Sequence, residues 1–267
     1  MYVVSTPDSK APACPGLTVF STSSPGMAGP QCCTPGPGAE HCCIGKEENC
    51  GSLVAYITSH HTPTAGILLV NDIFGFEAPL LRKLADTLAS YGYYVVVPDF
   101  FNKDPYVPPS TGDWSAGFGG WIKNHQALDS VEAAKGVVKC ILDKGLPCVG
   151  AVGFCWGAKV VVQLAKGNEL KAAVLAHPSF VTVEDIHDVK TPIAILAAEI
   201  DQTTPPALAE KFADVLKSKP EVESFVHIYP KVAHGWTCRY NPESPEEVAN
   251  AAEAHNKMIE WFGKYLH

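Results

Sequence analysis

The chain has 267 residues, of which 46% are hydrophobic and 18% charged, a composition typical of a folded globular protein and not of a disordered chain. Its 20 Lys and Arg against 28 Asp and Glu give a net charge of −8, which argues against a nucleic-acid-binding protein. No uncharged apolar stretch approaches the roughly 20 residues that span a bilayer, which argues against an integral membrane protein.

The N-terminal segment differs in composition from the rest of the chain. Gly and Pro account for 13 of the first 50 residues and for 31 of the remaining 217, so this segment has little apolar surface to bury. We predict a flexible leader over residues 1–48 and a single folded domain over residues 49–267. Transit peptides for organelles are rich in arginine, and the leader has none, which argues against organelle targeting but leaves it as an alternative. Met27 is an alternative start to Met1.

The ten cysteines do not form the pattern of a secreted disulfide framework. Residues 1–30 carry only Asp8 and Lys10 as charges and no apolar core, so they do not resemble a signal peptide. We therefore expect a reducing, cytoplasmic compartment. The leader contains no C-x-x-C pair, and adjacent cysteines are awkward ligands for one tetrahedral ion, so we expect no metal. Six cysteines lie in the first 50 residues: Cys14, Cys32, Cys33, Cys42, Cys43 and Cys50.

From residue 51 on, apolar runs of strand length alternate with amphipathic helical patterns. Continuous apolar strands separated by helices are typical of a parallel sheet that helices cover on both faces. The sequence therefore predicts one α/β domain with a mostly parallel sheet. The expected strands are 53–58, 66–70, 93–97, 148–154, 172–176, 192–198 and 224–229, and the expected helices are 78–91, 127–144, 156–166, 205–217 and 246–265.

One motif follows the strand at 148–154, where the sequence reads Gly-Phe-Cys-Trp-Gly over Gly153–Gly157. Strand, G-x-C-x-G and helix is the pattern of a nucleophile elbow with Cys in place of Ser. The glycines let the backbone make a sharp turn, and the helix N-terminus points at Cys155 and favours a thiolate. The alternative is a buried structural cysteine on a tight turn, because free cysteines usually belong to the core.

Two further candidates stand at the ends of later strands, in the order that the elbow motif requires. Asp201 follows the strand at 192–198, and His234 follows the strand at 224–229. In an open parallel sheet, functional residues gather beyond the carboxyl ends of the strands. We therefore predict a Cys155–Asp201–His234 triad, with Glu199 as the alternative acid.

The motifs together resemble the dienelactone hydrolase family of the α/β-hydrolase fold, and within it the eukaryotic, plant-like members. The resemblance runs from about residue 53 to the C-terminus. The matching segments are Asn71–Gly75, Val97–Phe101, Gly112–Trp114, Gly153–Gly157 and Ala233–Gly235.

The resemblance implies roles for residues at the reaction centre. Cys155 is expected to be the nucleophile, His234 the general base and Asp201 its orienting acid. The backbone N–H groups of Trp156 and Ile73 are expected to form the oxyanion hole.

It also implies roles around that centre. Asp72 takes the position of an acid that contacts the resting thiol. Bacterial members hold the substrate carboxylate with two arginines, but Lys103 and Cys238 stand at those positions here, which disfavours dienelactone itself as the substrate. The chain has only two arginines, Arg82 and Arg239, and we expect both near the pocket, where a guanidinium can hold a carboxylate through two hydrogen bonds. The alternative is that both form ordinary ion pairs at the surface.

We therefore predict a cytoplasmic thiol hydrolase that cleaves a small ester or lactone through a covalent acyl-enzyme, without metal or organic cofactor. Its partner would be a small-molecule substrate, with no nucleic acid or membrane, and the protein would be a monomer or a weak homo-oligomer. Two alternatives stay open. One is a β-glucanase-like glycoside hydrolase, in which Asp72 and Asp201 would act as the pair of carboxylates, and the other is a non-catalytic module that binds a small molecule.

Overall fold

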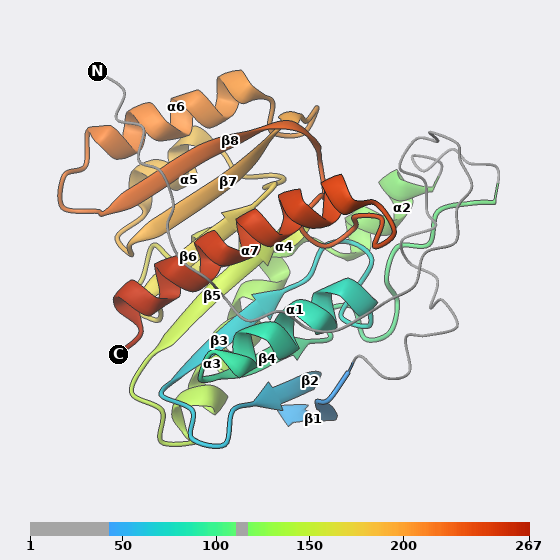
Figure 1. Ribbon diagram of the computed structural model, residues 1–267, viewed down its shortest axis with the longest axis vertical. Coiled ribbons are helices and arrows are strands. Elements are labelled where there is room, and N and C mark those ends of the chain that lie inside the picture. The colour runs from blue at the N-terminus through green and yellow to red at the C-terminus, as the bar shows by residue number, and fades with distance from the viewer. Residues whose placement is uncertain (1–42, 111–116) are drawn as a thin grey trace.

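The computed structural model describes residues 43–110 and 117–267, whose strands form one sheet with helices against both faces (Figure 1). The order across this sheet is β1-β2-β4-β3-β5-β6-β7-β8. β2 pairs antiparallel with β1 and β4, and the strands from β4 across to β8 pair in parallel. The predicted α/β class and mostly parallel sheet are thus confirmed. The strands are β1 (Lys46–Cys50), β2 (Leu53–Ser59), β3 (Ala65–Val70), β4 (Tyr93–Pro98), β5 (Val149–Phe154), β6 (Ala172–Ala176), β7 (Ile193–Ile200) and β8 (Ser224–Ala233).

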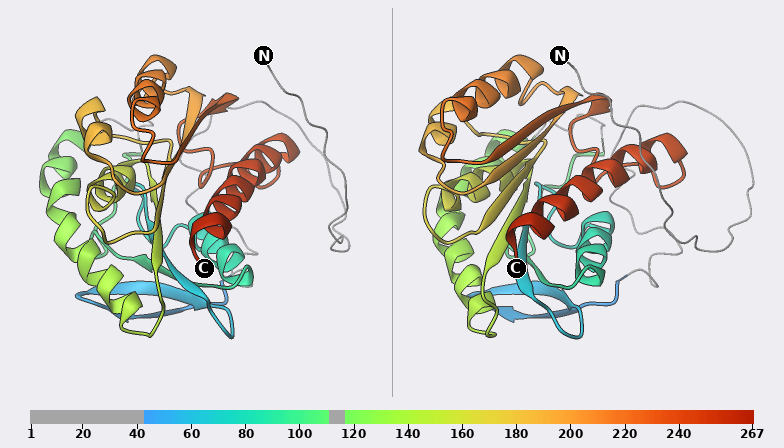
Figure 2. Two further views of the ribbon diagram at one scale, coloured as in Figure 1. Left: turned by 90° about the vertical axis from the view of Figure 1, so that its left-hand side faces the viewer. Right: turned by 60° about the vertical axis from the view of Figure 1, so that its left-hand side comes forward.

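The helices form two layers, one on each face of the sheet (Figure 2). α1 and α7 pack on one face, and α3, α4, α5 and α6 pack on the other, with α2 and the short 3₁₀ helix η3 beside them. The helices are α1 (Pro79–Ser90), α2 (Phe118–Asn124), η3 (Ala127–Ser130), α3 (Val131–Leu142), α4 (Trp156–Leu164), α5 (Val183–Asp188), α6 (Pro206–Lys217) and α7 (Pro245–Tyr265).

The central strands are apolar along their whole length because both of their faces are covered. β3, β5 and β6 are buried at every residue. Along β3, Leu68 and Val70 face the layer that holds α4, whereas Ile67 and Leu69 face α1 and α7. Side chains that alternate between two apolar layers leave no polar positions in the strand. These buried strands therefore carry the clearest pattern in the sequence.

The structure also contains elements that the apolar pattern does not predict. β1 begins at Lys46, inside the range assigned to the leader, so the sheet starts before the predicted boundary at residue 49. The first four of its five residues are exposed, which gives no strand-like pattern. α2 and α5 are seven and six residues long, too short for a helical period to be recognised. The helix expected over 127–144 is divided into η3 and α3.

A disulfide joins the edge of the sheet to the helix layer. It pairs Cys50 at the end of β1 with Cys140 on α3, with their Cα atoms 5.7 Å apart. This pairing differs from the expectation of reduced cysteines. Among the described cysteines, Cys148, Cys155 and Cys238 are buried thiols. The remaining cysteines of the predicted leader up to Cys42, and the Gly112–Trp114 segment, lie outside the described residues.

Candidate functional site

Cys155 lies in the turn between β5 and α4. Its φ of 52° and ψ of −112° belong to a region that residues with a side chain rarely adopt. The flanking glycines have a steric reason, because a Cβ on Gly153 would lie 2.4 Å from Gly157 O, and one on Gly157 would lie 2.3 Å from Val70 O. The chain thus has the strand–turn–helix arrangement that the motif predicts. Cys155 is the N-cap of α4 and is buried, with 7% of the residue exposed.

Asp201 and His234 follow β7 and β8, and their side chains meet. His234 Nδ1 lies 2.7 Å from Asp201 Oδ2. The other carboxylate oxygen, Oδ1, accepts backbone N–H bonds from Thr203 at 2.7 Å and from Thr204 at 3.1 Å. The side chain of Asp201 has no exposed surface, so these bonds fix it completely. A carboxylate held in this way orients the imidazole ring, as an acid in a catalytic triad does.

The charges of the cluster favour a thiolate beside an imidazolium. Burial by itself raises the pKa of the Cys155 thiol, but attraction to His234 and Arg239 outweighs burial, and the pKa is lowered. Burial by itself lowers the pKa of His234, but the Cys155 thiolate and the Asp201 carboxylate outweigh it and raise that pKa to about 9. Each member of the pair therefore stabilises the charged form of the other, and a thiolate is a stronger nucleophile than a thiol.

The oxyanion hole predicted from the sequence would use the backbone N–H groups of Trp156 and Ile73. Trp156 is the first residue of α4, so its N–H group has no acceptor inside the helix. Ile73 lies in the turn after β3, and α4 touches the end of that strand at Gly157. Within the described residues neither N–H group has a hydrogen-bond acceptor. Unused donors on two adjoining segments, with the positive end of a helix, suit a developing oxyanion.

Asp72 belongs to a buried polar cluster beside the thiol. Its Oδ1 accepts the N–H of Phe74 at 2.9 Å, and its Oδ2 lies 3.1 Å from Arg239 Nε and 3.7 Å from Cys238 Sγ. The resemblance implied a contact with the resting thiol. In the structure Asp72 acts on Cys155 through charge repulsion, which by itself raises the thiol pKa. The attraction of Arg239, which lowers the thiol pKa, is the larger of these two effects.

Arg239 reaches this cluster because of the glycine that follows His234. Gly235 has a φ of 95°, and a Cβ there would lie 2.2 Å from Arg239 Nη2. The guanidinium also lies over the ring of Phe74, 5.0 Å from its centre. One of the two arginines singled out from the sequence is therefore beside the triad.

The other arginine is placed differently. Arg82 on α1 forms an ion pair with Glu47 at 2.7 Å and donates from Nε to Phe76 O at 3.1 Å. Its guanidinium lies over the ring of Tyr56, 4.8 Å from the centre. These contacts join α1 to the strands β1 and β2. Within the described residues none of them reaches Cys155.

Lys103 and Glu199 make their hydrogen bonds with other residues than Cys155, Asp201 and His234 within the described residues. The backbone N–H of Lys103 donates to Asp99 Oδ2 at 2.8 Å, and its side chain is exposed. Glu199 is exposed and accepts the N–H of Lys231 at 2.6 Å. Asp201, and not the alternative Glu199, is therefore the acid that meets His234.

The structure adds two residues, Ser179 and His177, that the sequence did not single out. Ser179 Oγ lies 3.3 Å from Cys155 Sγ. His177 is completely buried, with Nε2 2.8 Å from Thr237 Oγ1 and its ring centre 5.0 Å from that of His234. Burial lowers the pKa of His177 well below its usual range, so this ring is neutral. His177 and Ser179 follow β6, so reading the end of that strand would have found them.

The described residues contain neither a helix long and apolar enough to cross a membrane nor three His, Cys, Asp or Glu side chains grouped as metal ligands.

Comparison with known proteins places the site in context. Residues 53–266 match the model of the dienelactone hydrolase family. A carboxymethylenebutenolidase homologue of Xenopus tropicalis is 32% identical over 239 residues, covering 88% of this chain and 96% of the relative. A maize protein named endo-1,3;1,4-beta-D-glucanase is 39% identical over 172 residues, covering 64% of this chain and 54% of the relative, so the chain spans about half its length.

Among solved structures, a putative dienelactone hydrolase from Klebsiella pneumoniae superposes with a TM-score of 0.67 at 22% identity, covering 80% of this chain and 93% of that chain. This likeness concerns the fold. Together with the observed sheet order it confirms the predicted α/β-hydrolase fold.

Proposed function

The chain belongs to the dienelactone hydrolase family, a family of hydrolases, and we propose that it cleaves small esters or lactones with Cys155 as the nucleophile. The observation that carries this proposal is the meeting of three side chains from three strand ends. Cys155 caps α4 in a strained turn, and the buried Asp201 holds His234 at 2.7 Å. A thiolate, an imidazolium and a carboxylate in this order are the parts of a nucleophilic triad.

The proposed reaction has two stages. In the first, the Cys155 thiolate attacks the carbonyl carbon, and the N–H groups of Ile73 and Trp156 bind the resulting oxyanion. The C–O bond then breaks, and the leaving alkoxide takes the proton of the His234 imidazolium. In the second, His234 removes a proton from water, the hydroxide attacks the thioester, and the thiolate leaves as the acid product forms.

Arg239 is the residue that we propose to set substrate preference. It lies beside Asp72 and influences the thiol, which supports a place at the edge of the substrate pocket. The contacts of Arg82 and Lys103 lie elsewhere, so a role for them in substrate binding rests on the sequence resemblance alone. Because Asp72 offsets the charge of Arg239, we propose a small ester or lactone and do not commit to an anionic one.

A glycoside hydrolase is the second candidate, because of the name of the maize relative. Such enzymes use two carboxylates on opposite sides of the bond that breaks. Here Asp201 is committed to His234 and Asp72 to Arg239, and neither contact suits an acid that must exchange protons with a sugar. This arrangement supports the ester hydrolase. The third candidate, a pocket that binds a small molecule without turnover, leaves the activated thiol without a role.

One set of variants separates these candidates. We expect Cys155→Ala to lose hydrolysis of a chromogenic ester by several orders of magnitude, and Cys155→Ser to lose most of it, because a hydroxyl needs a stronger base. Cys148→Ala is the matched control, since it removes another buried thiol and should stay active. Full ester turnover by Cys155→Ala would reject the proposal. Hydrolysis of mixed-linkage glucan by the same variant would support the glycoside hydrolase.

The cellular setting stays a proposal as well. We propose a cytoplasmic protein that acts as a monomer or weak homo-oligomer, without metal, cofactor, nucleic acid or membrane. The Cys50–Cys140 disulfide is the observation that speaks against a strongly reducing compartment.

A further inference from the structure

The segment that follows β6 runs directly past the nucleophile. The N–H of Cys155 donates to Ala176 O at 3.1 Å, and the N–H of Ser179 donates to Cys155 O at 2.9 Å. These two hydrogen bonds hold both the N–H and the C=O group of Cys155 against the segment that follows β6. The side chain of Ser179 is thereby brought to the sulfur, with Oγ 3.3 Å from Sγ.

The hydroxyl of Ser179 is committed to the sulfur and not to the turn that carries it. Serines in turns commonly bond a nearby backbone group with their hydroxyl. Here the thiol is the one hydrogen-bond partner of the hydroxyl in the part of the chain that the structure describes. Ser179 is only 2% exposed, so solvent does not compete for the hydroxyl.

We propose that Ser179 is a further residue of the catalytic site, whose hydroxyl donates a hydrogen bond to the Cys155 thiolate and holds its sulfur beside His234. This inference rests on the proposed function, because it assigns Ser179 to the reaction of Cys155. The thiolate carries no proton, so in that state only the hydroxyl can donate. When the sulfur becomes part of a thioester it loses its charge, and the bond weakens. The bond therefore favours the free thiolate between turnovers.

The backbone on both sides of Ser179 is held in uncommon conformations. His177 has a φ of 37° and Phe180 has a φ of 62°, although both carry large side chains. Thr204, which also binds Asp201, donates from Oγ1 to Pro178 O at 2.7 Å. Uncommon backbone angles persist only where the surroundings enforce them, and they cluster at functional sites.

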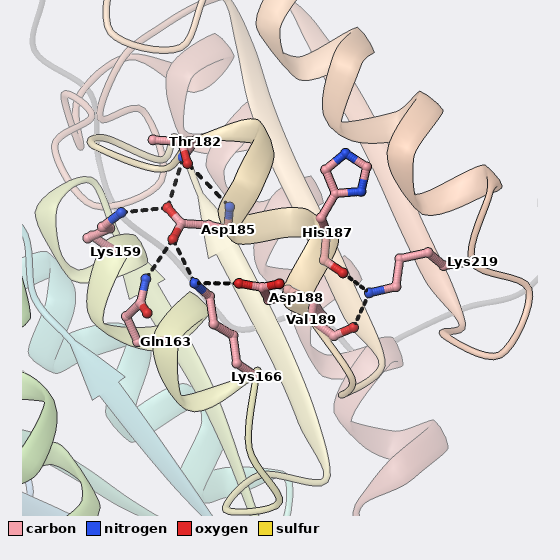
Figure 3. Close-up of polar contacts among 9 residues, drawn as sticks. All are labelled: Lys159, Gln163, Lys166, Thr182, Asp185, His187, Asp188, Val189 and Lys219. Atoms are coloured by element: carbon pink, nitrogen blue, oxygen red, sulfur yellow. Dashed lines mark hydrogen bonds and ion pairs between the residues drawn. The ribbon is translucent and has the colours of Figure 1, made fainter.

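A buried carboxylate fixes the far end of the same segment (Figure 3). Asp185 of α5 binds Lys159 Nζ at 2.5 Å, Gln163 Nε2 at 2.7 Å and Lys166 Nζ at 2.9 Å, and these three residues lie on α4 or just beyond its end. It also closes a capping box with Thr182, the N-cap of α5.

α4 begins immediately after Cys155, and α5 begins four residues after Ser179. Asp185 therefore links the start of α5 to α4, and these two helices adjoin the segments that carry Ser179 and Cys155. The contacts of Asp185 thus help to keep Ser179 Oγ close to Cys155 Sγ.

The test is the pH dependence of alkylation of Cys155 by iodoacetamide, followed on the peptide that contains this residue by mass spectrometry. Loss of one hydrogen bond to the thiolate in Ser179→Ala should raise the apparent pKa of the thiol by about one unit. The alkylation rate at a pH below that pKa should then fall about tenfold. Ser179→Thr keeps the hydroxyl and should recover part of the rate.

The control is Thr191→Ala, which removes another buried hydroxyl, one that contacts Leu170 O and not the sulfur. It should titrate as the wild type does. An unchanged alkylation profile in Ser179→Ala, or an equal shift in Thr191→Ala, would overturn the inference.

Ester hydrolysis by Cys155→Ala separates this inference from the function on which it rests. If that variant is inactive while Ser179→Ala titrates as wild type, the inference alone fails. If Cys155→Ala hydrolyses esters normally, the proposed function fails and the role of Ser179 in it fails too.

Discussion

Replacing Gly157 by alanine tests whether the contact between α4 and β3 sets the geometry of the reaction centre. The new Cβ would lie 2.3 Å from Val70 O and 2.7 Å from Asn71 O, whereas ordinary contacts begin at 3.4 Å. Both oxygens are backbone carbonyls, one of the last residue of β3 and one of the residue after it, and cannot rotate away as a side chain could. The first turn of α4 must therefore move from β3 by about 1 Å, in a core that is packed like a crystal.

That displacement affects the two N–H groups that we propose to bind the oxyanion. Trp156 moves with α4, while Ile73 stays with the chain after β3, so the spacing of the two N–H groups changes. Loss of one such donor typically costs about 10² to 10³ in kcat. Overpacking of this kind also costs about 1–3 kcal/mol of stability. We expect kcat for a chromogenic ester to fall about a hundredfold or more, KM to change little, and Tm to drop by several degrees.

Gly136→Ala is the matched control, because its Cβ would meet nothing within 4 Å and it lies inside α3. Alanine there should raise stability by up to about 1 kcal/mol and leave kcat unchanged. Steady-state kinetics and calorimetry on the two variants decide the matter. Wild-type kcat and Tm in Gly157→Ala would show that the α4–β3 contact does not hold the donors in place.

Three further predictions concern Arg239, the disulfide and the pH profile. If Arg239 binds an anionic group of the substrate, Arg239→Ala should lower kcat/KM for anionic esters about tenfold to a hundredfold and leave that of neutral esters unchanged. Arg239→Lys should recover part of the loss. Equal losses on anionic and neutral esters would mean that Arg239 acts through Asp72. Reduction of Cys50–Cys140 removes a link between residues 90 positions apart, so dithiothreitol should lower the unfolding free energy by about 4 kcal/mol, and Cys140→Ser should not respond to it. Because the pKa of His234 is raised to about 9, kcat/KM should fall as the pH rises through about 9 and the imidazolium loses its proton. NMR titration of His234 in Cys155→Ala should give a lower pKa, because the thiolate is gone. An unchanged pKa would contradict the ion pair between Cys155 and His234.

The sequence predicts best the central strands, because they are buried along their whole length and therefore consist of apolar residues. β3, β5 and β6 are buried throughout and read as apolar runs, so their ends could be located within a residue or two. Cys155 follows β5, and Asp201 and His234 follow β7 and β8, and parallel strands bring their carboxyl ends to one edge of a sheet. The prediction of a Cys155–Asp201–His234 triad therefore needed no knowledge of side-chain packing.

The part that it does not predict depends on contacts between segments far apart in the chain. β1 is charged and exposed, and it exists as a strand because β2 offers it a free edge. Arg82 pairs with Glu47 on that unpredicted strand, so its direction could not be inferred from α1 alone. The positions of Ser179 and His177 at the end of β6 can be read from the sequence, but the positive φ angles of His177 and Phe180 in that turn cannot.

The turn after β6 explains how side chains from separate strands hold one geometry. Ser179 contacts Cys155, the carbonyl of Pro178 accepts from the threonine that also binds Asp201, and His177 binds the threonine three residues beyond His234. Two residues of this turn have positive φ, a conformation that costs about 1–3 kcal/mol each. The ion pairs of Asp185 stand directly after the turn and tie the start of α5 to Lys159 on α4 and Lys166 just beyond it, so they oppose a movement of the turn away from Cys155.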